Sequence, residues 1–261
     1  MKALYIASTG MSAQERNVEV ISNNIANMRT TGYKRARAEF EDLLYQQITR
    51  AGSQTSATGS VVPAGVEIGS GVRTVSTPRI MSQGSVNMTE GELDVAISGE
   101  GFFPVQMPDG RTAYTRDGSF ERSAEGDLVT SSGYTVDPGI SIPTDATSVV
   151  ISEDGVVSAY VGTDSVATQI GQLQLARFVN KSGLESLGDN LFMDTAASGA
   201  PQLGVPNGEG TGSLLQGYLE MSNVNSVTEI ADLIAAQRAY EMNARVISGA
   251  DEMMQSTSQL R

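Results

Sequence analysis

Apolar residues recur at helical spacing near the start of this 261-residue chain. Within residues 3–28, steps of three and four join seven apolar side chains and one glutamine: Leu4, Ala7, Met11, Gln14, Val18, Ile21, Ile25 and Met28. An a/d heptad held for nearly four repeats is typical of a helix that packs along another helix. The pattern predicts an amphipathic helix that ends near residues 28–31, with Gly32 as its left-handed cap.

A second stripe occupies the other end of the chain, in residues 227–260. Ser226 and Glu229 form a capping-box pair just before it, which marks a helix start. The stripe consists of Ile230, Leu233, Gln237, Tyr240, Ala244, Ile247 and Met254. Because neither helix can bury such a stripe alone, we expect the two ends to pair as a coiled coil, with each other or with neighbouring copies. Ordinary packing onto a globular core is the alternative explanation for each stripe.

The segment after the first helix shows a different pattern. Ala36, Ala38 and Phe40 alternate with charged residues, which predicts extended chain. From Phe40 to Ile48 the apolar residues step at helix-like intervals, which predicts a short helical stretch. Residues 51–60 are small and polar, as in a flexible linker, and the glycines and proline of residues 61–71 exclude a regular helix. We therefore expect residues 32–71 to form an extended connector.

The middle of the chain carries the pattern of a β-meander. Turn pairs stand at Asp109-Gly110, Asp117-Gly118, Glu125-Gly126 and Ser132-Gly133, and short apolar segments lie between them. This regular spacing predicts short antiparallel strands. The expected fold class is α+β. It has a helical domain from residues 1–31 and 226–261, and a β-rich domain from residues 72–225.

Composition excludes several kinds of chemistry. The chain has no Cys, no His and no Trp, so Ser-His-Asp triads, thiolate nucleophiles and metal centres on His or Cys ligands are excluded. Gly99-Glu100-Gly101 begins like a phosphate loop but lacks the third glycine. The acidic cluster at Glu90, Glu92 and Asp94 is expected by chance in so acidic a region. We therefore predict no enzyme activity and no catalytic, cofactor-binding or metal site.

The middle of the chain is much more acidic than its two ends. The net charge is −13; residues 1–50 carry +2, residues 51–226 carry −13 and residues 227–261 carry −2. An acidic surface of this kind is solvated and excludes nucleic acid as a partner. No stretch approaches 18 apolar residues, so we expect no membrane insertion. The five-residue apolar run Ala3 to Ala7 is too short for a cleaved signal peptide.

Several motifs, in order along the chain, resemble those of the bacterial flagellar axial proteins that build the rod and the hook. The N-terminal motif comprises Asn23, Asn24, Asn27, Thr31, Gly32, Tyr33 and Lys34. The segments 99–103, 114–120, 183–186, 222–225 and 237–244 are similar to further parts of the same family. The resemblance covers nearly the whole chain.

The resemblance implies a structural subunit. Such a subunit would leave the cell through the flagellar type III apparatus, without a cleaved signal peptide. It would polymerise into a straight helical tube that transmits motor torque through the periplasm to the hook. The implied partners are copies of itself, the proximal rod proteins and hook protein at the ends of the tube, and the P- and L-ring proteins around it. The implied location is the flagellar basal body, from the periplasm to the outer membrane.

Within the family, the length of the chain and residues 46–72 are most similar to the distal rod subunits. In that case residues 46–72 would form an ordered arm between neighbouring subunits that keeps the tube straight. A proximal rod or hook subunit is the nearest alternative. Two further alternatives come from outside the family: a secreted β-protein that binds polysaccharide, and a type III translocator or adhesin with coiled-coil ends.

Overall fold

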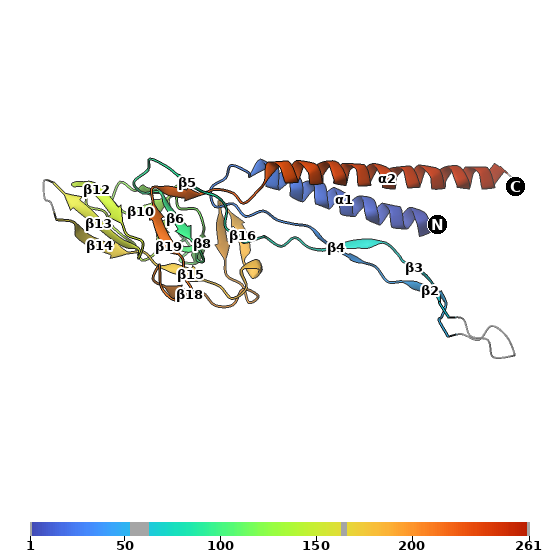
Figure 1. Cartoon of the computed structure of the whole chain (residues 1–261), viewed down its shortest axis with the longest axis horizontal. Helices are drawn as coiled ribbons and strands as arrows, with labels where there is room; N and C mark the ends of the chain where they lie inside the picture. Colours follow the sequence, from blue (N-terminus) through green and yellow to red (C-terminus); the bar gives the residue numbers. More distant parts are fainter. Residues whose placement is uncertain (1, 53–62, 163–165, 260–261) are drawn as a thin grey trace. The chain divides into compact units, whose positions relative to one another are not determined.

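The computed structural model describes residues 2–52, 63–162 and 166–259 (Figure 1). Residues 53–60 of the expected linker lie outside the described residues. The chain forms two compact units. The helical unit contains residues 1–25, 36–78 and 225–261, and the β unit contains residues 26–35 and 79–224. This arrangement confirms the predicted α+β fold class, with the terminal helices paired and the strands antiparallel.

Two antiparallel helices form the body of the helical unit, α1 (Lys2–Ala26) and α2 (Ser226–Gln259) (Figure 1). Near the end of α1, Asn24 Nδ2 donates a hydrogen bond to Glu229 Oε2 at 3.1 Å. Fourteen residues earlier, Gly10 lies against Asn243, where an added Cβ would be 2.9 Å from Nδ2. The two contacts give one consistent register. A side chain at position 10 would require the Asn243 side chain to move.

The C-terminal end of α1 and the N-terminal cap of α2 both differ from the sequence prediction. α1 ends at Ala26, before the expected residues 28–31. The chain turns there because the Asn24 side chain binds the backbone of Ala36, which lies beyond the helix. Asn24 Oδ1 accepts a hydrogen bond from Ala36 N, and Asn24 Nδ2 donates one to Ala36 O, both at 2.9 Å. Gly32 has the expected positive φ of 68°, but it lies in the following turn and does not cap the helix.

The cap of α2 is Asn225 and not Ser226. Asn225 Oδ1 accepts hydrogen bonds from the backbone N–H groups of Val227 at 3.0 Å and Thr228 at 3.3 Å. These are the first N–H groups that lack a partner within the helix, and an asparagine side chain satisfies them well. Glu229, which was expected to complete a capping box, instead points its carboxylate at Asn24.

A two-stranded ribbon completes the helical unit. β1 (Glu39–Asp42) pairs with β4 (Val72–Ser76), and β2 (Gln46–Thr49) pairs with β3 (Val66–Ile68). The helical stretch predicted between Phe40 and Ile48 is therefore wrong. Strands within residues 66–76 form backbone hydrogen bonds with this segment. The spacing of apolar residues in one segment cannot predict such pairing with a later segment. Thr9 Oγ1 of α1 accepts a hydrogen bond from Val72 N at 3.3 Å, which ties the ribbon to the helix.

The β unit is built around a seven-stranded antiparallel sheet in the order β16-β17-β8-β7-β11-β10-β9. Its strands are β7 (Phe103–Gln106), β8 (Thr112–Thr115), β9 (Phe120–Arg122), β10 (Leu128–Thr130), β11 (Thr135–Val136), β16 (Glu185–Gly188) and β17 (Leu191–Met193). The predicted turn pairs join or flank five of these strands, which confirms the short antiparallel strands. The predicted β-meander is wrong at one connection, because β9 follows β8 in the chain but lies at the edge of the sheet beside β10.

Smaller antiparallel sheets surround this one. They are β12-β13-β14 (Ala146–Ile151, Val156–Val161, Thr168–Gln172), β6-β19 (Val95–Ser98, Ser213–Gln216), β5-β20 (Val86–Met88, Tyr218–Glu220) and β15-β18 (Leu175–Arg177, Gln202–Gly204). A 3₁₀ turn, η1, spans Lys181–Gly183. β13 alternates between buried and half-buried residues over most of its length, whereas β6 and β7 are each buried at three consecutive positions.

The β unit has two apolar clusters. The larger one is fully enclosed and includes Ile97, Phe103 and Leu128, each 0% exposed. The smaller one is aromatic, with Phe102, Tyr114, Phe178 and Phe192 in edge-to-face contacts at centroid distances of 4.8–5.9 Å. Close packing of this kind accounts for the stability of the unit without disulfides.

The position of the α2 cap can be tested by two single substitutions. We expect N225A to lower the free energy of unfolding by about 1 kcal/mol, because two N–H groups lose their acceptor. S226A should change it by no more than a few tenths of a kcal/mol, since serine is not the cap. Urea unfolding followed by helical circular dichroism measures both. A larger effect of S226A than of N225A would contradict the assignment.

Candidate assembly surfaces and a buried ion triad

Most of the predicted seam residues of α1 are sheltered from solvent. Ala7 and Ile21 are buried, and Leu4, Met11, Gln14, Val18 and Ile25 are half-buried. Met28 lies beyond the helix end, in a turn of the β unit, and is exposed. Seven of the eight predicted seam residues are therefore buried or half-buried, and the last one belongs to another element.

The predicted seam of α2 coincides only in part with the face that pairs inside one chain. Leu233, Ala244 and Ile247 are half-buried, whereas Ile230, Gln237, Tyr240 and Met254 are exposed. The buried positions are Glu229, Ala236 and Ala250, which stand seven and fourteen residues apart. Two of these sites, Ala236 and Ala250, carry small side chains, which leave room for close packing. Sequence reasoning missed them because alanine carries little hydropathy signal, although their heptad spacing was visible.

The helical unit leaves many apolar side chains uncovered. On α2 these are Val227, Ile230, Ile234, Tyr240, Met242, Val246, Met253 and Met254, which are between 37% and 76% exposed. A solvent-exposed helix normally carries polar residues on its outer face, and exposed apolar surface of this extent marks an interaction site.

The ribbon presents a second uncovered apolar surface. Its exposed members are Leu44 at 88%, Tyr45 at 56%, Ile48 at 61%, Val66 at 52%, Ile68 at 37% and Val75 at 49%. An isolated two-stranded ribbon is marginally stable in water, and it gains stability when its apolar side chains are covered. The ribbon therefore has the properties of a segment that packs against another chain.

Residues of the N-terminal motif are placed to fix the chain where α1 ends. Asn24 is 2% exposed and links α1 to Ala36 and to Glu229 of α2, all within the helical unit. Asn27 Oδ1 accepts from Thr30 Oγ1 at 3.2 Å in the following turn. Asn23 lies exposed and Thr31 half-buried. The motif thus combines a buried residue that binds two segments, Asn24, with turn residues and with the exposed Asn23.

The next motif residues anchor the same segment inside the β unit. Gly32 N donates to the backbone oxygen of Glu220 at 2.8 Å, and no side chain fits at Gly32 because a Cβ would lie 2.7 Å from Asp117 N. Tyr33 is 8% exposed, with the Arg79 guanidinium 5.6 Å above its ring. The short motif therefore contacts three distant parts of the β unit.

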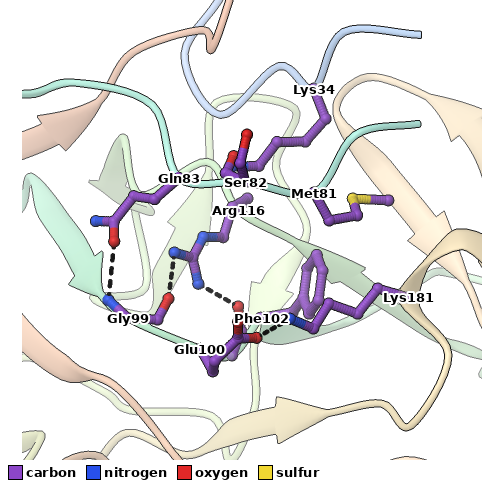
Figure 2. A pocket seen from close by; sticks show the side chains of 10 residues that line it. Lys34, Met81, Ser82, Gln83, Gly99, Glu100, Phe102, Arg116 and Lys181 are labelled. Atoms are coloured by element: carbon purple, nitrogen blue, oxygen red, sulfur yellow. Dashed lines mark hydrogen bonds and ion pairs between the residues drawn. The ribbon is translucent and has the colours of Figure 1, made fainter. Parts of the chain in front are cut away.

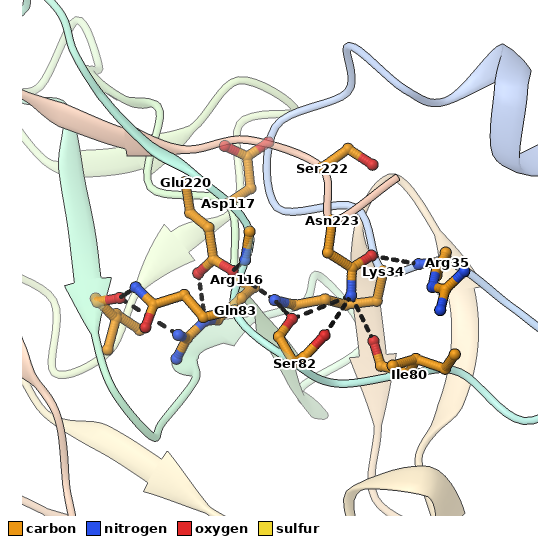
Figure 3. Close-up of polar contacts among 12 residues, drawn as sticks. Lys34, Arg35, Ile80, Ser82, Gln83, Arg116, Asp117, Glu220, Ser222 and Asn223 are labelled. Carbon is orange, nitrogen blue, oxygen red and sulfur yellow. Dashed lines mark hydrogen bonds and ion pairs between the residues drawn. The ribbon is translucent and has the colours of Figure 1, made fainter. Parts of the chain in front are cut away.

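Lys34 ends the motif in a buried ion triad with Glu220 and Arg116 (Figure 3). The three side chains are 2%, 0% and 5% exposed. Lys34 Nζ forms an ion pair with Glu220 Oε1, and Arg116 Nε donates to Glu220 Oε2 at 2.7 Å. Gly84 N also donates to Glu220 Oε1, at 2.9 Å. One carboxylate thus neutralises two buried cations from distant parts of the chain.

The remaining donors of Arg116 bind backbone oxygens. Its guanidinium donates to Gly99 O at 2.6 Å (Figure 2). It also donates to Gly101 O at 2.5 Å and to Ile97 O at 3.3 Å. Gly99 and Gly101 have φ values of 113° and 142°, which side chains rarely allow, so the glycines permit this turn of the chain. The Gly99-Glu100-Gly101 sequence that begins like a phosphate loop therefore supports an internal arginine.

A small cavity of about 110 Å³ lies beside Arg116 (Figure 2). It is lined in part by Lys34, Phe102 and Lys181. Lys181 is paired with Glu100, and the two other cations are committed to Glu220. The charges around the cavity are therefore satisfied by the protein itself, which favours a structural role for this region.

Burial lowers the pKa of Lys34 from its usual value of 10.5, and the nearby Glu220 carboxylate offsets part of that effect. The folded chain therefore binds this proton less tightly than the unfolded chain does. It follows that charged Lys34 costs stability at neutral pH. This cost fades only as the pH rises through the folded-state pKa of the lysine.

Comparison with known proteins places these motifs in one family. Residues 4–34 match the model "Flagella basal body rod protein", and residues 96–159 match "Flagellar hook protein FlgE/F/G D1 domain". Residues 215–260 match "Flagellar basal body rod FlgEFG protein C-terminal". Each of the three matched regions contributes one member of the ion triad.

Curated relatives match the chain from end to end. The flagellar basal-body rod protein FlgG of Caulobacter vibrioides is 56% identical over 261 residues, 100% of both chains. The protein of that name from Agrobacterium fabrum is 54% identical over 97% of both chains. The one from Buchnera aphidicola of Acyrthosiphon pisum is 51% identical over 99% of both. The chain belongs to the flagellar basal-body rod protein family.

This is a family of structural components of the flagellum, in agreement with the surfaces described above. Within residues 2–52, 63–162 and 166–259, no helix is long and apolar enough to cross a membrane. The same residues contain no group of three or more acidic side chains arranged to hold a metal ion.

The ion triad predicts unequal effects for its members. E220L should lower the free energy of unfolding of the β unit by about 3–5 kcal/mol, because two cations stay buried without their anion. K34M should lower it by less than about 2 kcal/mol, because Arg116 and Gly84 still satisfy Glu220. Urea unfolding monitored by tyrosine fluorescence compares them. Equal losses would show that Glu220 is not the centre of the triad.

Proposed function

We propose that this chain is a structural subunit of the flagellar distal rod. The end-to-end match with proteins named FlgG, at 50% identity or more for four of them, is the observation that carries the proposal. The uncovered apolar faces of α2 and of the ribbon support polymerisation. A proximal rod or hook subunit is not favoured, because those would be expected to match other members of the family over the full length.

The helical unit is the proposed assembly element. Ile230, Tyr240 and Met254 of the predicted seam are exposed in one chain, and in the polymer they would pack against neighbouring copies. Each apolar side chain that becomes buried contributes roughly 1.5–3 kcal/mol. Subunit contacts between two different surfaces would repeat without closing, which produces a filament. Residues 1–31 and 226–261 would then form the inner layer, and residues 72–225 the outer layer.

The ribbon is proposed to act as the arm between neighbouring subunits. Residues 32–71 connect the two layers in this proposal, and residues 46–72 pack against the next copy. The exposed apolar side chains Leu44, Tyr45 and Ile48 supply the contact surface. A contact along an extended ribbon resists bending because it fixes neighbours at two separated points. The arm would thereby keep the rod straight.

The proposed partners follow from the position of the distal rod. They are other copies of the chain, proximal rod proteins and hook protein at the two ends, and the P- and L-ring proteins around the tube. Export would use the flagellar type III apparatus, and the rod would extend from the periplasm to the outer membrane. The acidic residues 51–226 would keep the rotating surface hydrated and weakly adhesive towards the rings.

Negative-stain microscopy of the purified chain at high concentration tests the proposal. We expect straight tubes from the full chain, and none from a version that lacks residues 1–30 and 227–261, since the assembly faces lie there. Straight tubes favour a rod subunit over a hook subunit. The absence of tubes from the full chain, even on preformed rod fragments, would argue against an axial subunit.

The arm is tested by making its surface polar. The variant L44S/I48S removes two side chains that are 88% and 61% exposed, so it should leave the free energy of unfolding within about 0.5 kcal/mol of the original. We expect its tubes to be curved or shorter. A matched control, V179S, changes an apolar residue of the β unit that is 82% exposed. Straight tubes of normal length from L44S/I48S would remove the support for an arm.

A further inference from the structure

The loop of residues 205–212 carries the one Asn-Gly pair of the sequence, at Asn207 and Gly208. It follows β18 and precedes β19, and the whole loop belongs to the β unit. Asn207 is exposed and has a positive φ of 58°, a conformation that asparagine tolerates better than most residues. A hydrogen bond from Asn207 N to Gly212 O at 2.8 Å closes the loop.

An Asn-Gly pair can react with itself. The backbone nitrogen of the glycine loses its proton and attacks the side-chain amide carbon of the asparagine, and ammonia leaves. Water then opens the resulting succinimide ring, so that aspartate or isoaspartate remains. One water is consumed and one ammonia is released, and no oxidant or reductant takes part. Glycine favours the attack because no Cβ shields its nitrogen, and asparagine is accordingly one of the thermally labile residues.

The folded loop restrains the attacking nitrogen. Gly208 N donates a hydrogen bond to Thr211 Oγ1 at 3.0 Å and a longer one to Val205 O at 3.3 Å. Thr211 Oγ1 itself donates to Val205 O at 2.7 Å, which turns its lone pairs toward Gly208 N. Removal of the proton from Gly208 N would break these bonds and leave a negative nitrogen facing two oxygen atoms. The loop therefore disfavours the first step of the reaction.

The leaving amide is restrained as well. Asn207 Nδ2 donates a hydrogen bond at 2.8 Å to Oδ1 of Asp154, which lies in the turn between β12 and β13. This bond holds the Asn207 side chain, so its amide carbon must break a contact before it can turn toward Gly208 N. The Asp154 carboxylate also repels the negative charge that develops on the amide oxygen during the attack.

We propose that Asn207 is a deamidation site and that Thr211 keeps it unreactive while the loop is folded. Thr211 acts through the backbone nitrogen of Gly208 and not on the reacting amide, so it is a positioning residue. The reaction then waits for the loop to open, and exposed loops open at a lower free-energy cost than core strands do. The product places a second negative charge beside Asp154.

Deamidation would affect the surroundings of the ion triad through Gly212. Gly212 O accepts the loop-closing bond from Asn207 N, and Gly212 N donates to Glu100 O at 2.6 Å. Glu100 stands between the two glycines whose backbone oxygens bind Arg116. Isoaspartate adds one carbon to the backbone, which displaces the loop-closing N–H group. An isoaspartate at position 207 would therefore loosen the support of the turn that holds Arg116.

Mass spectrometry of peptides from the aged chain measures deamidation at each asparagine separately. We expect Asn207 to react at least about tenfold more slowly in the folded chain than in guanidinium chloride, because the loop must first lose more than one hydrogen bond. Asn190, which precedes leucine, is the internal reference. In the unfolded chain Asn207 should react faster than Asn190, since only Asn207 is followed by glycine.

Two substitutions separate the hydroxyl of Thr211 from the bulk of its side chain. T211V keeps the shape but removes Oγ1, so Asn207 in the folded chain should deamidate about fivefold faster, the rate equivalent of one lost hydrogen bond. T211S keeps the oxygen and should react at the original rate. In guanidinium chloride all three chains should react alike. Tyrosine fluorescence during urea unfolding checks that both variants are folded under the conditions of the rate measurement.

Equal rates at Asn207 in the folded and the unfolded chain would overturn the proposal, and so would equal rates for folded T211V and T211S. The aged chain also tests the link to the ion triad. Molecules with isoaspartate at position 207 should unfold at a lower urea concentration than unmodified molecules, and identical midpoints would remove that link. All of these measurements are made on single chains in solution, so they hold whether or not the chain polymerises.

Discussion

A single buried carboxylate holds together segments that lie far apart in the chain. Glu220 is fully enclosed and binds Lys34, Arg116 and Gly84 N, so residues before, within and after the main sheet converge on one group. An unpaired charge at this depth would cost several kcal/mol, so the three segments are stable only together. The two ends of the β unit, from which the chain continues into α1 and α2, are fixed by this requirement.

Local signals along the chain predict much of the fold. The Asp109-Gly110 and Glu125-Gly126 turns identify strands because a tight turn is specified by adjacent residues. The heptad stripe of α1 predicts its pairing face because helical spacing repeats within one element. The same reasoning fails between Phe40 and Ile48. There the strands are determined by partner strands at residues 66–76, later in the chain, and a few apolar residues are compatible with both helix and strand.

The roles of the residues at the candidate site were harder to predict from the sequence. The resemblance to the axial family identifies Asn24 and Lys34 as important, but not what they do. Their roles depend on Glu229 and Glu220, which lie 205 and 186 residues away in sequence. Glu220 has no distinguishing pattern in an acidic chain, and the pattern at Glu229 predicted a capping box instead. The predicted seam of α2 differs from its buried positions for a related reason. Ala236 and Ala250 are buried but small, and a hydrophobic pattern gives little weight to alanine.

The pairing of α1 with α2 has a consequence for the order in which the molecule is made. The hydrogen bond between Asn24 and Glu229 joins groups 205 residues apart, so α1 lacks its partner helix until nearly the whole chain exists. At a synthesis rate of 5–20 residues per second, that interval lasts about 10–40 s. Contacts of such long sequence separation also form slowly, because a large loop must close first. The newly made chain therefore keeps its first helix available to other binding partners for much of its synthesis, and it completes its fold only after its last helix has appeared.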